Sequence, residues 1–286
     1  MSGSIQGTLS ETEVYQFYQQ TDQIVFSPTE IVQPNQFNYW AGFDGTNNEA
    51  DKLNISNSER PTTIYTISEQ IKNASTNNNQ VVGYFPGPGT TDSLPGSSFM
   101  PWQVTQEAVQ TAYTAYNDFA VKAAAWLKQE GNENGSISTM VAGFSRGGAA
   151  SAIFLQLVDT KGLIDPSDPT NILIEPGSVD IANVMLIDPV LTGNLGNMGF
   201  PPSAKNVTVL RALDELRTLF PYADYDDLRV NVIEIFGNHG DLGGMYDDNG
   251  IGALVLEKIT EFYKKSNLSI DDVDDLEKRG QIYFLA

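Results

Sequence analysis

The residue with the clearest chemistry is Ser145, which stands at the centre of a G-x-S-x-G pattern, GFSRG. An apolar run typical of a buried strand precedes it over residues 137–144, and a helical pattern follows over 146–158. This arrangement is typical of a nucleophile elbow, a tight turn that exposes a reactive serine. Small residues are expected two positions to either side, because larger side chains would collide with the neighbouring strand or helix. The first N–H groups of the helix would point at the same spot, which favours an oxyanion there.

Three further polar residues follow predicted strands, as Ser145 does: Asp44, Asp188 and His239. Functional groups gather at the carboxyl ends of strands in open parallel sheets, so these side chains are expected at one edge. The order Ser…Asp…His is the chain order of α/β-hydrolase triads. In such a triad, His239 accepts the proton of Ser145, and Asp188 holds the imidazole tautomer and stabilises the imidazolium.

An oxyanion hole is predicted from the backbone N–H of Arg146 together with one from the loop of Gly45 and Thr46. Asp44, which precedes this loop, and Asp241, which follows His239, are secondary candidates for the site.

Each of these residues also has a plainer interpretation. The Asp44–Thr46 stretch is compatible with a simple turn, and Asp188, which precedes a proline, with a turn-forming aspartate. Arg146 is as compatible with a structural ion pair as with a substrate clamp. The acidic runs at 224–227, 247–248 and 271–275 are interpreted as solvated faces or helix caps, since none has the spacing of a calcium loop.

Hydrophobic periodicity predicts alternating strands and helices, which indicates one parallel α/β sheet. The predicted strands cover residues 37–43, 81–85, 137–144, 184–187, 207–210 and 230–236; the helices cover 13–20, 61–72, 103–130, 146–158, 214–220 and 250–265. Pro61 is expected in the first turn of its helix. Residues 86–101 and 190–203, rich in glycine and proline, are candidates for a lid or a substrate-pocket wall.

The composition excludes several kinds of protein. The net charge of −20 argues against nucleic-acid binding and against docking on anionic lipid. There is no cysteine and only one histidine, so neither thiol catalysis nor a multi-histidine metal site is expected, and no metal or organic cofactor is implied. No apolar run is long enough to span a bilayer. No signal peptide is visible, which predicts a cytoplasmic location in the producing cell or export by a signal-independent route.

Five segments, in order, resemble a known family, the α/β-hydrolase domain of type VI secretion lipase effectors, formerly a domain of unknown function. They are FDGTNN from Phe43, YFPGPGT from Tyr84, GFSRGGAA from Gly143, LIDPV from Leu186 and IFGNHGDLGGMYDDNGIG from Ile235. The segment ALDELRTLFP from Ala212 is similar to a stretch between the family's Asp and His motifs. The resemblance implies Ser145 as nucleophile, Asp188 as acid and His239 as base, in a phospholipase of the A type.

The sequence thus predicts a polar N-terminal extension over residues 1–36 and a catalytic domain over 37–286. The domain is expected to be α/β-hydrolase-like, with a mostly parallel central sheet and helices on both faces. The predicted activity is that of a serine carboxylester hydrolase, most simply a phospholipase or lipase with a lipid ester as substrate and, for an effector, an immunity protein as partner. Two alternatives stay open: a soluble esterase acting on small polar substrates, and an inactive hydrolase fold that serves as an interaction module. The oligomeric state is left open.

Overall fold

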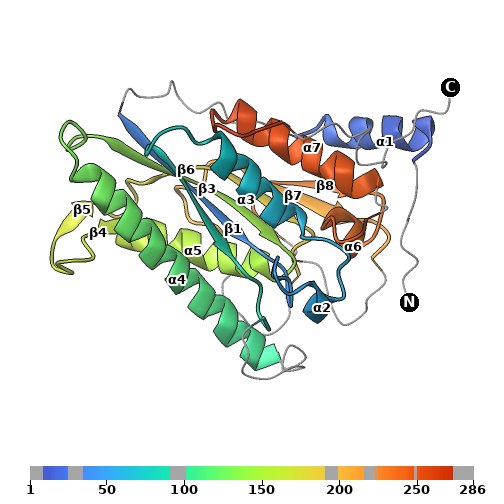
Figure 1. Ribbon diagram of the computed structural model, residues 1–286, viewed down its shortest axis with the longest axis horizontal. Coiled ribbons are helices and arrows are strands. Elements are labelled where there is room, and N and C mark those ends of the chain that lie inside the picture. The colour runs from blue at the N-terminus through green and yellow to red at the C-terminus, as the bar shows by residue number, and fades with distance from the viewer. Residues whose placement is uncertain are drawn as a thin grey trace.

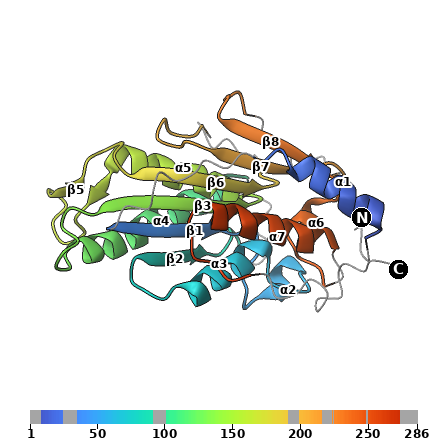
Figure 2. The same ribbon diagram turned by 90° about the horizontal axis from the view of Figure 1, so that it is seen from above.

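A six-stranded sheet with the strand order β2-β1-β3-β6-β7-β8 forms the centre of the molecule (Figures 1 and 2). Its strands are β1 (Gln36–Phe43), β2 (Gln80–Phe85), β3 (Ser136–Phe144), β6 (Asp180–Ile187), β7 (Val207–Ala212) and β8 (Val230–Ile235). All neighbouring pairs are parallel. Parallel neighbours need long crossover connections, and these place helices on the faces of the sheet. The central strands are therefore buried on both faces, which explains their continuous apolar sequences.

The computed structural model describes residues 9–24, 35–90, 101–190, 199–215, 223, 225–247 and 250–272. Its helices are α1 (Glu11–Thr21), α2 (Leu53–Ser56), α3 (Thr63–Ala74), α4 (Pro101–Leu127), α5 (Gly147–Lys161), α6 (His239–Leu242) and α7 (Gly250–Lys265). A separate pair of short antiparallel strands, β4 (Leu163–Ile164) and β5 (Ile172–Ile174), lies in the segment that connects α5 to β6.

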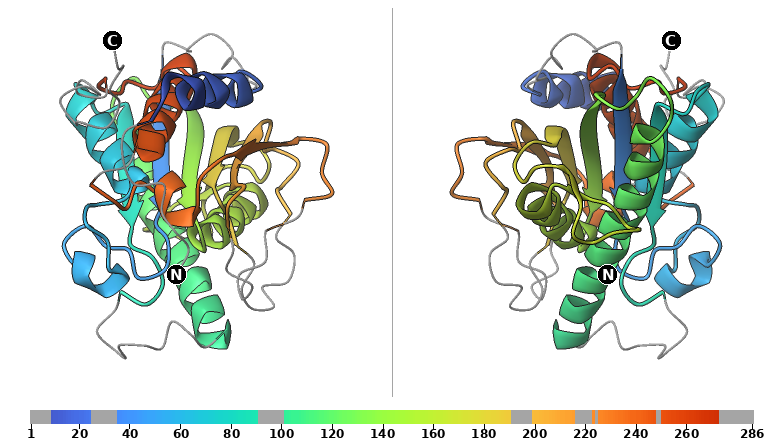
Figure 3. Two further views of the ribbon diagram at one scale, coloured as in Figure 1. Left: turned by 90° about the vertical axis from the view of Figure 1, so that its right-hand side faces the viewer. Right: turned by 90° about the vertical axis from the view of Figure 1, so that its left-hand side faces the viewer.

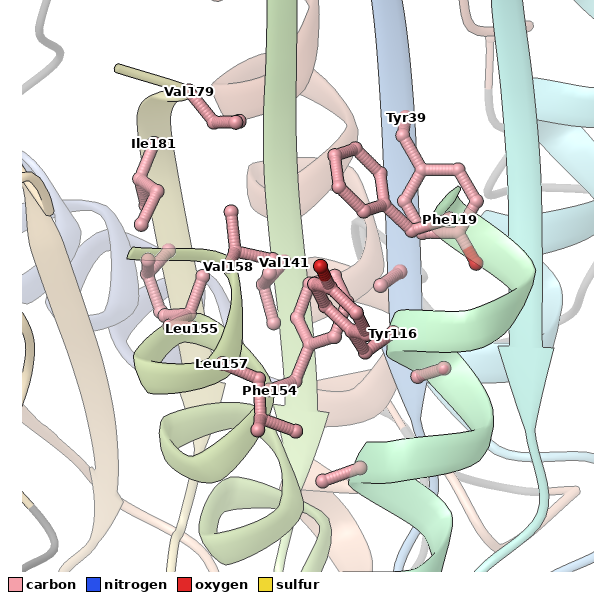
Figure 4. Packing of buried hydrophobic residues seen from close by; sticks show 14 of the residues in the cluster. Tyr39, Tyr116, Phe119, Val141, Phe154, Leu155, Leu157, Val158, Val179 and Ile181 are labelled. Carbon is pink, nitrogen blue, oxygen red and sulfur yellow. The ribbon is translucent and has the colours of Figure 1, made fainter. Parts of the chain in front are cut away.

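The sheet separates two hydrophobic cores, each covered by its own helices (Figure 3). On one face, α4 and α5 pack against the inward side chains of β1 and β3, and the aromatic rings of Tyr39, Phe119 and Phe154 meet there (Figure 4). On the other face, α1, α3 and α7 cover Trp40, Met140 and Ile233. The predicted mostly parallel sheet with helices on both faces is confirmed.

Several predicted boundaries need correction. Pro61 lies outside its helix, because Thr62 is the N-cap and its hydroxyl accepts a hydrogen bond from Tyr65 N–H. Strand β6 begins four residues earlier than predicted, at Asp180, although its first half contains the polar Asn183. That amide is buried and satisfied, since it donates to Ser266 Oγ at 2.9 Å and accepts from Asn206 at 3.0 Å. Helix α4 ends at Leu127 rather than at residue 130, and β7 continues to Ala212, two residues beyond its predicted end.

The helix predicted within the N-terminal segment is present as α1. Ser10 and Glu13 form a capping box at its start, and Phe17 is fully buried in the core that α7 covers. The predicted boundary between an extension and a catalytic domain at residue 36 stays a prediction. Most of the helix predicted over 214–220, and the central parts of both proposed lid segments, lie outside the described residues.

Candidate active site

Ser145 occupies a strained turn between β3 and α5. Its φ of 55° lies in the left-handed region, which a residue with a side chain adopts only under constraint from its surroundings. The glycines on either side are required by close packing. A Cβ atom on Gly143 would stand 2.4 Å from Ser151 Oγ, and one on Gly147 would stand 2.2 Å from the carbonyl oxygen of Phe43. The local geometry is that of the predicted nucleophile elbow.

Asp188 and His239 form a buried hydrogen-bonded pair. Asp188 follows β6 and His239 opens α6, and the distance from Asp188 Oδ2 to His239 Nδ1 is 2.6 Å. The other oxygen of Asp188 accepts a hydrogen bond of 2.9 Å from the N–H of Ala212, at the end of β7. The relative exposures of Asp188 and His239 are 1% and 8%. The end of β7 therefore holds the carboxylate while the carboxylate orients the imidazole at the start of α6.

Ser145 lies at the same end of the sheet as this pair. Its N–H donates to the carbonyl of Ile187, the residue before Asp188, at 3.0 Å. The ring of Phe144 stacks against the imidazole of His239, with 4.5 Å between centroids. Within the described part of the chain, Ser145 Oγ makes no hydrogen bond with the imidazole. Such contacts are often long in the absence of substrate and shorten on binding.

Asp44 is a buried carboxylate with three hydrogen-bond donors around it. It accepts from Thr62 Oγ1 at 2.8 Å, from Tyr84 OH at 2.7 Å and from the N–H of Gly45 at 2.8 Å. Burial raises the pKa of Asp44 to about 7, although the three hydrogen bonds oppose this rise. Asp44 thus joins the ends of β1 and β2 to the start of α3. Its bond with Gly45 also occupies one of the N–H groups predicted for the oxyanion hole.

Arg146 connects the elbow to the same loop. Its side chain is buried, with 4% relative exposure, and Nη1 donates to Thr46 Oγ1 at 2.9 Å. Arg146 is also the N-cap residue of α5, so its backbone lies directly beside Ser145. Thr46 and Arg146 are therefore held together next to the serine.

Asp241 has a local structural role. Its carboxylate accepts from the N–H of Asn238 at 3.0 Å, and its own N–H donates to Asn238 Oδ1 at 3.1 Å. This reciprocal capping box fixes the first turn of α6, which carries His239. The carboxylate that meets Nδ1 of the imidazole is that of Asp188.

Glu215 is a site residue that the pattern of strand ends does not reveal. Its carboxylate lies close to Asp188 and His239: one oxygen from each carboxylate and one ring nitrogen all lie within 4.8 Å of one another. Among the described residues, no other group of three or more His, Asp or Glu side chains is as close. Two atoms bound to one tetrahedral ion at ~2.1 Å stand ~3.4 Å apart, which exceeds the 2.6 Å between Asp188 Oδ2 and His239 Nδ1. That pair is a direct hydrogen bond rather than two ligands of one ion.

A pocket of about 530 Å³ opens beside the loop after β2. Its wall includes Phe85, Pro86 and Pro88, together with Glu107, Gln110, Thr111 and Thr114 of α4. The same loop is bonded to the Asp44–Asn48 segment, since Asn47 N–H donates to the carbonyl of Pro88 at 2.7 Å. No helix in the described ranges is both long and apolar enough to cross a membrane.

The chain matches the family model for the catalytic domain of the type VI secretion phospholipase effectors called Tle1-like, over residues 41–173. The match contains Ser145 and ends before Asp188. No curated protein gives a significant match to the sequence.

Two solved structures share the fold. The Tle1 effector bound to the VgrG spike of the type VI secretion system is 19% identical, with a TM-score of 0.52 over 75% of this chain and 52% of that one. An uncharacterized protein from Pseudomonas aeruginosa is 16% identical, with a TM-score of 0.57 over 87% of this chain and 49% of that one. The chain spans about half the length of each. The resemblance found in the sequence motifs is confirmed, and over residues 41–173 the chain is similar to the catalytic domain of the Tle1-like phospholipase effectors.

Proposed function

We propose that the protein is a serine carboxylester hydrolase that acts on phospholipids or other lipid esters. The observation that carries this proposal is the 2.6 Å bond between Asp188 Oδ2 and His239 Nδ1, at the same edge of the sheet as a serine on a strained elbow. The bond fixes the tautomer of the imidazole and leaves Nε2 as the proton acceptor. The match to a phospholipase family supports a lipid substrate.

The proposed reaction begins when Ser145 Oγ attacks the ester carbonyl carbon while His239 accepts the hydroxyl proton. Asp188 stabilises the imidazolium that forms. The imidazolium then donates its proton to the leaving alcohol as the acyl-enzyme forms, and water repeats the sequence to release the fatty acid. The negative charge of the tetrahedral intermediate is stabilised by backbone N–H groups of Arg146 and Thr46 in the proposal, since Gly45 N–H is bound to Asp44.

The wider setting is proposed from the relatives. A chain similar to the catalytic domain of Tle1-like effectors would be made in the cytoplasm and exported without a signal peptide, in association with a spike protein as in the Tle1 structure. An immunity protein would then protect the producing cell. Co-purification with the spike protein of the same organism tests this setting separately from the chemistry, and failure to associate would argue for an enzyme that acts elsewhere.

The decisive experiment combines labelling with product analysis. A fluorophosphonate probe should label the wild-type protein and not Ser145→Ala, and the same variant should lose ester hydrolysis by roughly 10³-fold or more. Ser151→Ala is the matched control, because Ser151 is the next serine along the chain and donates to the carbonyl of Gly147 within α5. Mixed phospholipids and short-chain esters, offered in parallel, separate a lipase from a small-molecule esterase. Undiminished turnover by folded Ser145→Ala would refute the proposed mechanism.

A further inference from the structure

Glu215 lies on a short segment that is bonded to the loop carrying His239. The segment follows β7, and its N–H groups continue the pairing with β8: Leu213 N–H donates to the carbonyl of Ile235 at 2.8 Å, and Asp214 N–H to that of Gly237 at 3.0 Å. The carboxylate of Asp214 accepts from the N–H of Gly237 at 2.7 Å in return. The two residues before Glu215 are therefore bonded to the end of β8 and to the loop that leads to His239.

The charges in this cluster are close and poorly screened. Carboxylate oxygens of Glu215 and Asp188 and a ring nitrogen of His239 lie within 4.8 Å of one another. Asp188 and His239 are buried and Glu215 is half-buried. Two negatively charged carboxylates at this distance repel each other. A positively charged imidazolium close to both attracts each of them and offsets that repulsion. The second carboxylate thus favours the protonated ring, which is the form created when serine gives up its proton.

Other ionisable groups on the segments that surround His239 each have a hydrogen-bond partner outside this cluster. They are Asp44 at the end of β1, bonded to Thr62, Tyr84 and Gly45; Arg146 at the elbow, bonded to Thr46; Asp214, bonded to Gly237; and Asp241 on α6 itself, bonded to Asn238. Glu215 differs from these groups because its carboxylate shares the cluster with both Asp188 and His239.

We propose that Glu215 is a second carboxylate of the catalytic histidine. It acts as a positioning residue that stabilises the imidazolium alongside Asp188 and takes over part of that role when Asp188 is replaced. The inference rests on the proposed function, in which His239 is the base. It predicts an electrostatic effect on the ring and a kinetic coupling between the two carboxylates.

The electrostatic part is tested by NMR, because His239 is the single histidine of the chain and its ring signals need no separation from others. Glu215→Gln should lower the pKa of the imidazole by about one unit, as loss of an opposite charge at this distance does. The acid limb of kcat/KM should move to lower pH by the same amount. Glu234→Gln is the matched control: it makes the same change on the exposed β8 residue that pairs with Arg211, and it should leave both values in place.

The coupling is tested by a double-mutant cycle. Glu215→Gln alone should lower kcat roughly 10-fold with little change in KM, and Asp188→Asn should be at least about 10-fold more harmful in the Glu215→Gln background than in the wild type. Thermal melting shows whether each variant is folded. An unmoved ring pKa, or purely multiplicative effects of the two substitutions, would overturn the inference and leave Glu215 as a turn residue.

The outcomes also separate this inference from the proposed function. If Ser145→Ala and His239→Ala abolish hydrolysis while Glu215→Gln shifts neither the NMR titration nor the acid limb, only the role of Glu215 fails. If the NMR titration shifts but no ester is hydrolysed by the wild-type protein, the electrostatic contact stands and the proposed function fails.

Discussion

Phe144 and His239 stack with their ring centroids 4.5 Å apart and their planes inclined by 29°. Phe144 is the last residue of β3 and directly precedes Ser145, so one strand both presents the serine and supports the imidazole. The ring of Phe144 is itself confined. A Cβ atom on Gly243 would stand 2.3 Å from it, and one on Gly45 would stand 2.7 Å from it. The relative position of the proposed nucleophile and base thus depends on the packing of one phenyl ring.

The first prediction follows from this packing. Phe144→Leu should keep the fold but let the imidazole move, and a loss of alignment should lower kcat by roughly 10-fold or more. Steady-state kinetics and thermal melting measure the two effects. Phe154→Leu is the control, since Phe154 is equally buried in the core on the other face. It should reduce the free energy of unfolding by about 1–3 kcal/mol with kcat nearly unchanged. A reversed pattern would show that the stacking does not align the base.

The second prediction compares the two aspartates nearest the imidazole in sequence or space. Asp188→Asn should lower kcat by roughly 10³- to 10⁴-fold, because an amide next to Nδ1 favours the wrong tautomer. Asp241→Asn should reduce stability more than kcat, because Asp241 caps α6 and contacts Asn238 rather than the ring. Kinetics and melting temperature of both variants decide the matter. A larger loss of kcat in Asp241→Asn would make Asp241 the triad acid.

The third prediction concerns the buried Asp44 and the pH dependence of stability. Burial raises its pKa in the folded protein from the ordinary value of 3.8 to about 7. Between these values the folded protein holds a proton that the unfolded chain has released. The free energy of unfolding contributed by Asp44 is therefore greatest below about pH 4 and falls until about pH 7. Asp44→Asn cannot titrate at this position, so the decline should be absent from the variant. The difference in the free energy of unfolding between wild type and variant should therefore change between about pH 4 and pH 7.

Urea unfolding at several pH values measures this difference. Asp168 provides a control of opposite sign, because hydrogen bonds from Thr170 lower its pKa in the folded protein. Asp168 therefore adds to the free energy of unfolding above its pKa in the unfolded chain, and this contribution is lost as the pH falls. Asp168→Asn lacks the contribution, so the variant should lose less stability than the wild type on acidification. A wild-type and Asp44→Asn difference that stays constant from pH 4 to 7 would contradict the raised pKa.

The parts of the fold that the sequence predicts well are those with local signals. The continuous apolar sequence of β3 and the small residues around Ser145 depend on neighbours a few positions away, and both were predicted closely. The early start of β6 was missed because Asn183 is polar. Its partners, Asn206 and Ser266, come from distant segments and satisfy the amide only in the folded chain.

The candidate site likewise contains residues that local sequence signals predict and residues whose positions depend on distant contacts. Strand ends predict that Ser145, Asp188 and His239 converge, since parallel strands bring their carboxyl ends together. Glu215 follows a strand as well, but three residues later, and its position depends on hydrogen bonds between two loops. The pairing of Gly45 with Asp44 likewise depends on how Thr62 and Tyr84 orient the carboxylate. No local pattern contains that information.

The last prediction tests the elbow through a single methyl group. Gly147→Ala would place a Cβ atom 2.2 Å from the carbonyl oxygen of Phe43 and 2.7 Å from that of Asp44. Both contacts are with backbone, so relief requires α5 or the Asp44–Thr46 loop to move. Either movement displaces the proposed oxyanion donors relative to Ser145, and loss of one such donor lowers kcat by roughly 10²- to 10³-fold.

The control is the same substitution at a glycine with open space around it. Gly177 has a φ of 75° and no atom within 4 Å of an added Cβ. Gly177→Ala should therefore reduce the free energy of unfolding by about 1 kcal/mol through backbone strain and leave kcat unchanged. In Gly147→Ala, the loss of kcat should exceed what the fraction of unfolded protein explains, because the damage is to the alignment of the elbow. Equal kcat in Gly147→Ala and the wild type would mean that the loop after β1 supplies no donor to the oxyanion.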